Sequence, residues 1–322
     1  MDSALNDEDV RDDSAELTTA VSVAGRNTYA DGTVVPEDEL QFMVSLRRNG
    51  QHVCGGSLLP DLRSVITTAH CVHDAHGNRV PVEHLSVAVG IRQRTHILRS
   101  HIFAVHQVVV HPSYDKLRIG NDIAVLRLTG SAAGIDNVAG VRLSSVGVEP
   151  PVDAPLLTAG WGRTEQRPFA SSSKVLLQTT LRMMDREKCR RTLGLNTIPK
   201  SQICAASSTS ATCEGDGGGL LVDRRNGADY LVGLISYGAS GCQRGMPTVF
   251  TKVSHYADWI EHVSNGHTED QATATAGNGF PFFVVLRHNG VHVCGGSLLP
   301  DLQSVITTAH CVHDKQYVSY NF

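Results

Sequence analysis

The chain has 322 residues, which is enough for two domain-sized cores. Its net charge of −4 and ordinary globular composition exclude a strongly basic nucleic-acid binder and give no attraction to anionic membranes. The sequence contains no run of about 18 apolar residues, the length that a membrane-spanning helix requires. We therefore expect no nucleic acid and no membrane as a partner.

The N-terminal segment and the cysteines give conflicting indications about whether the protein is secreted. Residues 1–28 begin with MDSALNDEDVRDDSAEL, which is acidic and lacks the apolar core of a secretory signal peptide, and they are predicted to be disordered. The cysteines are even in number and form no CxxC metal pair, which favours disulfides in an extracellular protein. A different N-terminus would reconcile the two signals. The eight cysteines are Cys54, Cys71, Cys189, Cys204, Cys213, Cys242, Cys294 and Cys311.

Residues 29–265 show mostly the two-residue period of strands. Leu85, Val87 and Val89 alternate with smaller residues, and residues 175–181 repeat this pattern. The runs IAVLRL (123–128) and LVGLIS (231–236) are interpreted as buried strands. Turn-rich breaks separate the runs at spacings that are typical of an all-β barrel or sandwich.

One helix is predicted, over SHYADWIEHV (254–263). Ser254 is suited to cap its first turn. Four large apolar side chains fall on one face of this helix, which indicates packing on the core. They are Tyr256, Trp259, Ile260 and Val263.

An internal repeat follows the helix. Residues 42–74 return as residues 282–314 at an offset of 240, with 28 of 33 positions identical. Residues 266–281, between the copies, are rich in small and polar residues and are predicted to be a linker. We interpret residues 282–322 as a truncated duplicate, from a partial duplication or from the fusion of two neighbouring genes. Such a fragment cannot close a barrel alone, and its unpaired edges would invite association.

Three separated stretches carry the residue types of nucleophilic catalysis. TTAHC places His70 beside Cys71, NDIAVL places Asp122 before a buried strand, and CEGDGGGL (213–220) is a glycine-rich turn. Histidine is the usual general base near neutral pH, and a buried carboxylate can fix its tautomer. A glycine-rich turn can aim backbone N–H groups at a developing oxyanion. This order along the chain matches the template of the serine proteases.

Together with CGGSLL (54–59), GWG (160–162) and SYGASGC (236–242), these stretches resemble the trypsin/chymotrypsin family. The resemblance covers roughly residues 29 to 264. It implies an all-β fold of two six-stranded antiparallel β-barrels with a C-terminal α-helix and a site in the cleft between the barrels. His70 would be the base and Asp122 its orienting partner. The implied disulfides are Cys54–Cys71, Cys189–Cys204 and Cys213–Cys242, with Cys294 and Cys311 repeating the first pair in the second copy.

The family pattern GDSGGP reads GDGGGL here, over residues 215–220. Gly217 therefore stands where the family has its nucleophilic serine. Glycine has no side chain, so an acyl-enzyme cannot form at this position. The resemblance assigns the oxyanion hole to the backbone N–H groups of Gly215 and Gly217. Three serines lie nearby in the sequence, and nothing there places them against the predicted base: Ser207, Ser208 and Ser210.

The activation segment is a second departure. Members of the family are usually switched on by cleavage after a basic residue, and the new N-terminal ammonium pairs with an aspartate, here Asp216. The corresponding segment is TYADG (28–32), and Arg26 lies two residues too early for cleavage at the usual place. We predict that this trigger is lost.

The specificity pocket is a third departure. Ala211 stands where trypsin-like members carry the aspartate that recognises Lys or Arg. Thr248 stands where a glycine is common in the pocket wall, and its branched side chain narrows the opening. Gly238 keeps the opposite wall open, and Ser236 completes the predicted pocket. We expect any side chain that enters to be small or apolar.

No metal and no cofactor is expected. The sixteen histidines include no HExxH motif and no Cys/His cluster. The family's calcium loop needs acidic residues that IRQRTH (91–96) lacks. His310 repeats the predicted base in the second copy but has no aspartate partner and no nucleophile loop.

Three functional hypotheses remain open. The first is a non-catalytic homologue that acts by binding a protein or peptide, as a decoy, an inhibitor or a cofactor of another protease cascade. The second is an active serine endopeptidase in which a Ser-to-Gly change affects one allele or sequence, supported by the retained His70 and Asp122. The third is a pseudogene product, which predicts no folded protein in its source. Sequencing the transcript across codons 211 to 220 separates the first two hypotheses.

Overall fold

The computed structural model describes most of the chain between residues 32 and 266, and three strands beyond it. The predicted N-terminal segment 1–28, residues 29–31 of the activation segment and all of the linker after residue 266 lie outside the described residues. The described ranges are 32–116, 119–164, 171–239 and 241–266, together with the backbone of 283–288, 291–298 and 305–306.

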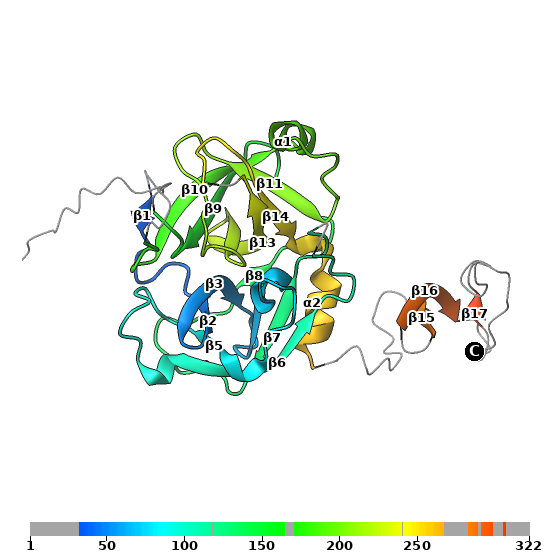
Figure 1. Cartoon of the computed structure of the whole chain (residues 1–322), viewed down its shortest axis with the longest axis horizontal. Coiled ribbons are helices and arrows are strands. Elements are labelled where there is room, and N and C mark those ends of the chain that lie inside the picture. The colour runs from blue at the N-terminus through cyan, green and yellow to red at the C-terminus, as the bar shows by residue number, and fades with distance from the viewer. Residues whose placement is uncertain are drawn as a thin grey trace, which may run out of the picture.

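Two closed barrels, each of six antiparallel strands, form the body of the molecule (Figure 1). The first has the strand order β2-β3-β4-β7-β6-β5. In the second, β9 pairs with both β10 and β12, which closes the ring β9-β10-β11-β14-β13-β12. The predicted all-β fold of two six-stranded barrels is therefore confirmed. The first barrel consists of β2 (Met43–Arg48), β3 (Gln51–Leu58), β4 (Ser64–Thr67), β5 (Leu85–Ala88), β6 (Ile102–Val110) and β7 (Ala124–Leu128), and the second of β9 (Pro155–Gly160), β10 (Leu177–Met184), β11 (Gln202–Ala206), β12 (Leu220–Arg225), β13 (Ala228–Gly238) and β14 (Thr248–Lys252).

The period-two runs point into the barrels, as the sequence predicts. Leu46 of β2 pairs with Val87 of β5, and both side chains are fully buried in the core of the first barrel. In β10 the buried residues Leu177 and Leu181 alternate with more exposed neighbours. Val175, which the pattern included, lies before β10 and forms an isolated bridge instead. Two short strands, β1 (Thr33–Val34) and β8 (Arg142–Leu143), add to the second barrel at β10 and β13.

The C-terminal helix α2 (Ala257–Ser264) packs on the first barrel, where Trp259 and Val263 contact β6 and β7. The helix begins three residues later than predicted, so Ser254 does not cap it. Ser254 lies in the 3₁₀ turn Val253–His255, and its hydroxyl donates to the carbonyl oxygen of Val148. The backbone enters α2 through Tyr256, which provides no side-chain cap.

A second helix, α1 (Arg186–Leu193), is an addition to the sequence prediction. Its signals are nevertheless local: Asp185 accepts a hydrogen bond from the backbone N–H of Lys188, and Gly194 ends the helix at a φ of 66°. The helix carries Cys189, which is fully buried and bonded to Cys204. None of the described helices is long and apolar enough to cross a membrane.

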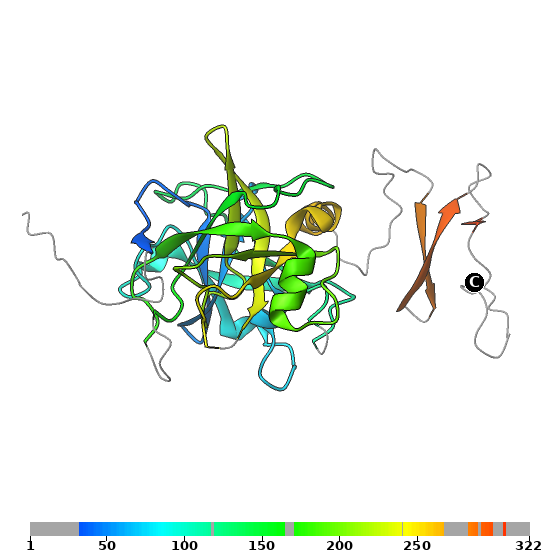
Figure 2. The same cartoon turned by 90° about the horizontal axis from the view of Figure 1, so that it is seen from above.

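The second copy of the repeat forms a three-stranded sheet of its own, with β15 (Phe283–His288), β16 (Val291–Leu298) and β17 (Val305–Ile306). Its first two strands form a twisted hairpin (Figure 2). The register is that of the first copy at the offset of 240, since Phe283 pairs with Ser297 as Met43 pairs with Ser57. Within the described residues, β15 and β17 pair only with β16, whereas β2 and β4 also pair with β5 and β7. The pairing of Cys294 with Cys311, and the side chain of His310, lie outside what the structure describes.

Candidate active site

The structure brings His70 and Asp122 together. His70 lies in the 3₁₀ turn Ala69–Val72 that follows β4, and Asp122 lies just before β7. The imidazole Nδ1 is 2.8 Å from Asp122 Oδ2, and the backbone N–H of His70 donates to Asp122 Oδ1 at 2.9 Å. A carboxylate only accepts hydrogen bonds, so the proton of the neutral ring is on Nδ1 and the lone pair is on Nε2.

Residues of the second barrel hold Asp122 in place. Ser236 of β13 donates its hydroxyl to Asp122 Oδ2 at 2.6 Å, and Thr251 of β14 donates to the Asp122 carbonyl oxygen at 2.7 Å. The Asp122 side chain is inaccessible to solvent, while that of His70 is 37% exposed. The pair thus lies in the cleft between the barrels. Ser236, predicted as part of the specificity pocket, lines the cavity there, but its hydroxyl is directed at the carboxylate.

The glycine-rich turn has a conformation that requires glycine at two positions. Gly215 has a φ of +95° and Gly218 a φ of +70°, a region that residues with a side chain rarely adopt. A Cβ at Gly218 would also lie 2.1 Å from Thr67 Oγ1. Within the described part of the chain, the backbone N–H groups of Gly215 and Gly217 have no hydrogen-bond acceptor. Two donors are therefore available where the predicted oxyanion hole lies.

The buried side chain of Asp216 fixes the shape of the glycine-rich turn by hydrogen bonds to the backbone. Its side chain is fully buried. Oδ1 accepts the backbone N–H of Gly162 at 2.7 Å, and Oδ2 accepts that of Cys213 at 2.8 Å. Residues 29–31, which the resemblance places at the activation terminus, lie outside the described residues. Among the described residues, the backbone N–H groups of Gly162 and Cys213, from two loops, hold the Asp216 carboxylate.

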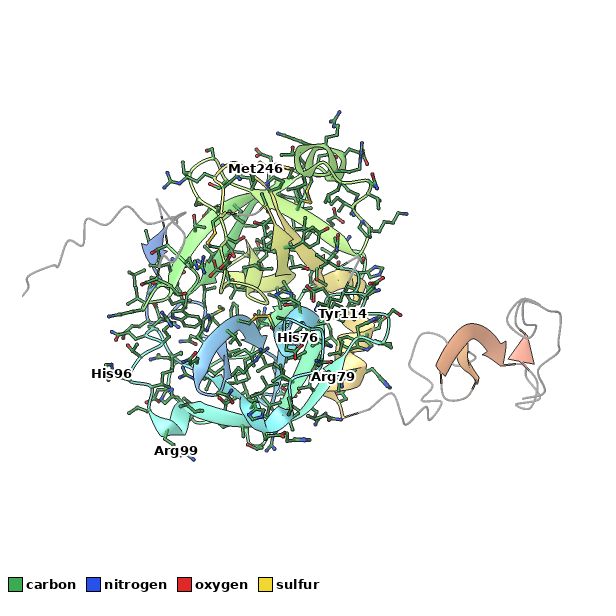
Figure 3. All side chains as sticks on the ribbon, in the orientation of Figure 1. His76, Arg79, His96, Arg99, Tyr114 and Met246 are labelled. Atoms are coloured by element: carbon green, nitrogen blue, oxygen red, sulfur yellow. A yellow bond between two sulfur atoms is a disulfide. The ribbon has the colours of Figure 1, made fainter. Side chains whose placement is uncertain are left out.

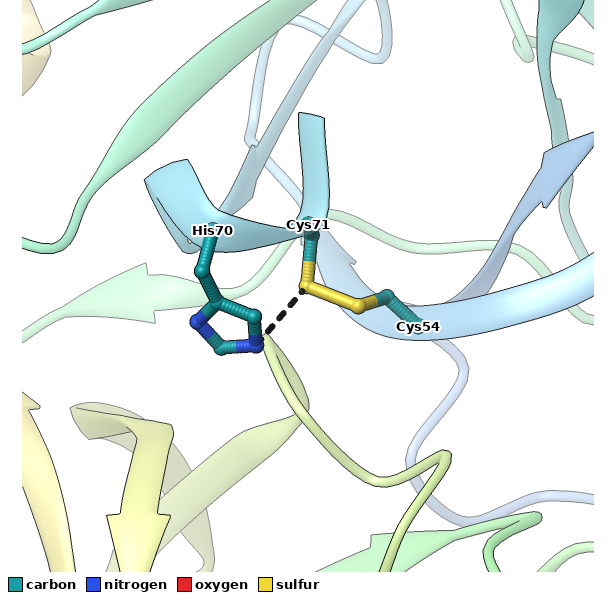
Figure 4. Close-up of side chains that lie close together, drawn as sticks. All are labelled: Cys54, His70 and Cys71. Carbon is teal, nitrogen blue, oxygen red and sulfur yellow. Dashed lines mark hydrogen bonds between the residues drawn. A yellow bond between two sulfur atoms is a disulfide. The ribbon is translucent and has the colours of Figure 1, made fainter. Parts of the chain in front are cut away.

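The ring of His70 occupies the space beside Gly217. A Cβ built at Gly217 would lie 2.7 Å from His70 Nε2 and 3.3 Å from Cε1, closer than side chains normally approach. Nε2 also lies 3.6 Å from Cys71 Sγ, so the ring edge faces the Cys54–Cys71 disulfide (Figure 4). Gly217 itself is not in the left-handed region, so its backbone would accept a side chain if the ring moved.

A cavity of about 500 Å³ extends from His70 and Gly217 to the predicted specificity pocket. Thr248 is directed across the base of this pocket, where its Oγ1 lies 2.7 Å from Thr212 Oγ1. Ala211 is almost fully buried beside it and adds no charge. These two side chains bring hydroxyls and no carboxylate to the base of the pocket. The carboxylate that does line the cavity, that of Glu214, is 69% exposed and lies 2.8 Å from Arg163 Nη2.

Three residues at the site are absent from the sequence prediction. Thr212 closes the pocket, and its position between Ala211 and Cys213 is the signal that could have identified it. Thr251 lies in an ordinary strand pattern and carries no local signal. His52 Nε2 donates to the Gly215 carbonyl oxygen at 2.9 Å, and its Nδ1 lies 2.8 Å from Ser45 Oγ. His52 thereby links the glycine-rich turn to the first barrel.

The nearby serines do not replace the missing nucleophile. The Ser210 hydroxyl is buried and bonded to Thr179 Oγ1 at 2.8 Å. Ser207 bonds Thr209, and Ser207 and Ser208 line a separate cavity on the second barrel. His70 does not line that cavity, and neither Ser207 nor Ser208 lines the cavity beside His70.

The three disulfides have the pairings that the resemblance implies: Cys54–Cys71, Cys189–Cys204 and Cys213–Cys242. Among the described residues, Cys54, His70 and Cys71 form a group whose potential donor atoms lie within 4.8 Å of one another. Their two sulfur atoms are bonded to each other (Figure 4), so they are not thiolates and cannot serve as the usual ligands of zinc.

Burial lowers the pKa of His52 from 6.5 to about 4, and the nearby Arg94 and Arg47 add to this effect. Between these pH values the unfolded chain binds a proton at His52 that the folded chain does not. We therefore expect the free energy of unfolding to fall as the pH falls from 6.5 towards 4, by at most about 1.4 kcal/mol per pH unit for this group. Urea denaturation at pH 7, 6 and 5 measures the slope. His52→Gln should reduce it, and equal slopes in the two proteins would contradict this assignment.

Comparisons with known proteins agree with this geometry. A family model described as Trypsin matches residues 30–260 and again residues 270–321. The chain is 33% identical to Trypsin 5G1 of Aedes aegypti over 243 residues, which cover 72% of this chain and 84% of that protein. It is 29% identical to Trypsin-1 of Astacus astacus over 230 residues, which cover 69% of this chain and 92% of that protein.

Proposed function

The chain belongs to the trypsin family, and on this premise we propose that it is a non-catalytic serine-protease homologue that binds an extended protein or peptide segment in its cleft. The role would be that of a decoy, an inhibitor or a cofactor of another protease cascade. The observation that carries the proposal is Gly217. With no hydroxyl at this position, the covalent step of the family's reaction has no acceptor atom.

The surroundings of Gly217 support the loss of peptidase activity. The Ser236 hydroxyl, which lines the same cavity, donates to Asp122 and is not directed at the cleft. The His70 ring crowds the position where a side chain at residue 217 would begin, with Nε2 2.7 Å from a Cβ built there. Peptide cleavage would need both a nucleophile and a proton donor for the leaving amine, and the described residues of the cleft supply one imidazole for both tasks.

The same cleft retains the features of a peptide-binding site. The free N–H groups of Gly215 and Gly217 can bind a carbonyl oxygen, and the pocket closed by Thr212 and Thr248 accepts a small or apolar side chain. The three disulfides support an extracellular location. No cofactor is needed for binding of this kind.

A second candidate is an active serine endopeptidase, in an allele that has serine at residue 217. The observation in its favour is the hydrogen-bonded pair of His70 and Asp122, at 2.8 Å, which a binding protein has no need to keep. Its test is sequencing of the transcript across codons 211 to 220, where a serine codon at residue 217 would favour this second candidate. Peptide hydrolysis by the purified Gly217 chain, with a broad mixture of fluorogenic peptides, tests the first candidate. We expect no hydrolysis, and a rate that is abolished by His70→Ala would contradict the loss of peptidase activity.

Binding is tested with a pocket variant. A Cβ at Gly238 would meet its neighbours at 3.5 Å or more, so the backbone there has room for a side chain, and Gly238→Val should narrow the pocket at this wall. We expect the variant to keep its melting temperature and to bind peptides with a small apolar residue at the pocket at least about tenfold more weakly, because that residue loses its buried position. Fluorescence anisotropy with labelled peptides measures the affinity. Equal affinities of the variant and the original chain would contradict binding in this pocket.

A further inference from the structure

We propose that the His70 ring is itself a nucleophile towards activated esters: Nε2 attacks the carbonyl carbon of an aryl ester, and water then hydrolyses the acyl-imidazole. The inference goes beyond the binding role and does not depend on the identity of the peptide or protein that the cleft binds. Three features of the site carry it: the position of Nε2, the hydrogen bond at the opposite ring nitrogen, and the two free N–H groups beside it.

Nε2 lies directly against the space that a side chain at residue 217 would enter. A Cβ at Gly217 would lie 2.7 Å from Nε2, closer than side chains normally approach, so the absence of a side chain leaves this nitrogen next to the glycine backbone. In an intact triad a serine oxygen would separate this nitrogen from the substrate. Here nothing attached to residue 217 does so. Nε2 faces a cavity of about 500 Å³ that is open to solvent, and 37% of the His70 side chain is exposed.

The opposite side of the ring keeps Nε2 nucleophilic. Nδ1 donates its proton to Asp122 Oδ2 at 2.8 Å, and this carboxylate is held by Ser236 and by the His70 backbone N–H. The lone pair is thereby fixed on Nε2. When the ring acquires positive charge on acylation, the buried carboxylate stabilises it, as it would stabilise a protonated ring.

The glycine-rich turn can stabilise the oxyanion that forms. Within the described residues the N–H groups of Gly215 and Gly217 have no acceptor, and both residues line the cavity that His70 lines. The buried Asp216 carboxylate holds the turn through the backbone N–H groups of Gly162 and Cys213. The donors are therefore in place before a substrate arrives, which is the condition for effective electrostatic stabilisation.

The reaction balances with water as the one co-reactant. The Nε2 lone pair forms a bond to the ester carbon, the carbon–oxygen bond to the aryl group breaks, and the phenolate leaves with that electron pair. The ring is then an N-acyl imidazolium whose Nδ1 proton stays on the hydrogen bond to Asp122. Water adds to the acyl carbon and loses one proton to solvent, and the carbon–nitrogen bond breaks with its electrons returning to Nε2. The carboxylic acid then loses the second proton of that water to solvent, and the phenolate remains an anion.

The same chemistry leaves peptides intact. An amine departs only after it has gained a proton, and in an active protease the histidine supplies it. In this chain the nitrogen that faces the cleft is bonded to the acyl carbon at that moment. The activity is therefore limited to leaving groups that are stable as anions, such as nitrophenolate.

The test uses the full chain and p-nitrophenyl acetate, with release of nitrophenolate followed by absorbance. We expect His70→Gln to lower the rate roughly tenfold or more, because the nucleophile is removed. The matched control is His96→Asn, at an exposed histidine on the outer edge of the first barrel (Figure 3), and it should keep the original rate. Asparagine suits this site because residue 96 has a φ of 58°. Melting temperatures of both variants establish that each is folded.

Two further measurements separate nucleophilic attack from activation of water. Mass spectrometry of the acid-quenched chain should find one acetyl group on the peptide that contains His70. The rate of the first turnover, in which nitrophenolate is released as His70 is acetylated, should agree within error in heavy water and in ordinary water, since no proton moves during the attack of Nε2. Acetyl groups confined to lysines, an unchanged rate in His70→Gln, or a marked slowing of the first turnover in heavy water would each overturn the proposal.

Discussion

Gly217→Ser is expected to give the chain peptidase activity, with an increase of at least about 10³-fold in the hydrolysis of peptides that carry a small residue at the pocket. The change adds the one atom that the His70–Asp122 pair lacks. The backbone at Gly217 is compatible with a side chain, and the donors of the glycine-rich turn are already free. The measurement is the rate at which the purified full chain hydrolyses fluorogenic peptides.

The His70 ring must move for this variant to work. A serine Cβ cannot remain 2.7 Å from Nε2, but the obstacle is a partly exposed ring and not backbone, so a small rotation relieves the contact. Gly217→Ala is the matched control, because it displaces the ring in the same way without adding a hydroxyl. We expect this control to stay inactive towards peptides. A folded but silent Gly217→Ser chain would contradict the prediction and would mean that the altered pocket or activation segment also prevents catalysis.

Asp216→Ala is expected to lower the free energy of unfolding by at least about 3 kcal/mol, since it leaves buried donors without acceptors. The two donors are the backbone N–H groups of Gly162 and Cys213, which belong to different loops. Because the carboxylate joins these loops, the glycine-rich turn should also lose its shape, and peptide binding should weaken with stability. Urea denaturation and peptide anisotropy measure the two effects.

Asp136→Ala is the control for this change. Asp136 is exposed on a loop of the first barrel, and no hydrogen bond or ion pair of its side chain is present within the described residues. Its replacement should alter stability by no more than about 0.5 kcal/mol. Similar losses in both variants would show that Asp216 has no special structural role.

The sequence by itself determined much of the architecture. Strand periodicity, which is local, predicted an all-β barrel or sandwich, and the resemblance to the trypsin/chymotrypsin family implied two six-stranded barrels. Alternation at Leu85 and Val87 predicted an inward-facing strand, and the order of His70, Asp122 and the glycine-rich turn predicted the fold and the absence of a nucleophile at Gly217. The repeat shows the same local control: β15, β16 and β17 have the register of β2, β3 and β4. The predicted start of α2 was wrong by three residues, because the hydrogen bond of the Ser254 hydroxyl to the Val148 carbonyl oxygen outweighed its tendency to cap a helix.

Only the tertiary structure decided which side chains hold Asp122 in place and that the His70 ring lies against Gly217. The hydroxyls that fix Asp122 come from β13 and β14, more than 100 residues away in the chain, and no local pattern reveals such partners. The hydrogen bond between Thr212 and Thr248 joins the loop before Cys213 to the start of β14, and the contact of His70 with Gly217 joins the two barrels. Contacts of this kind depend on how strands pack in three dimensions, whereas the loss of a serine can be read from one residue.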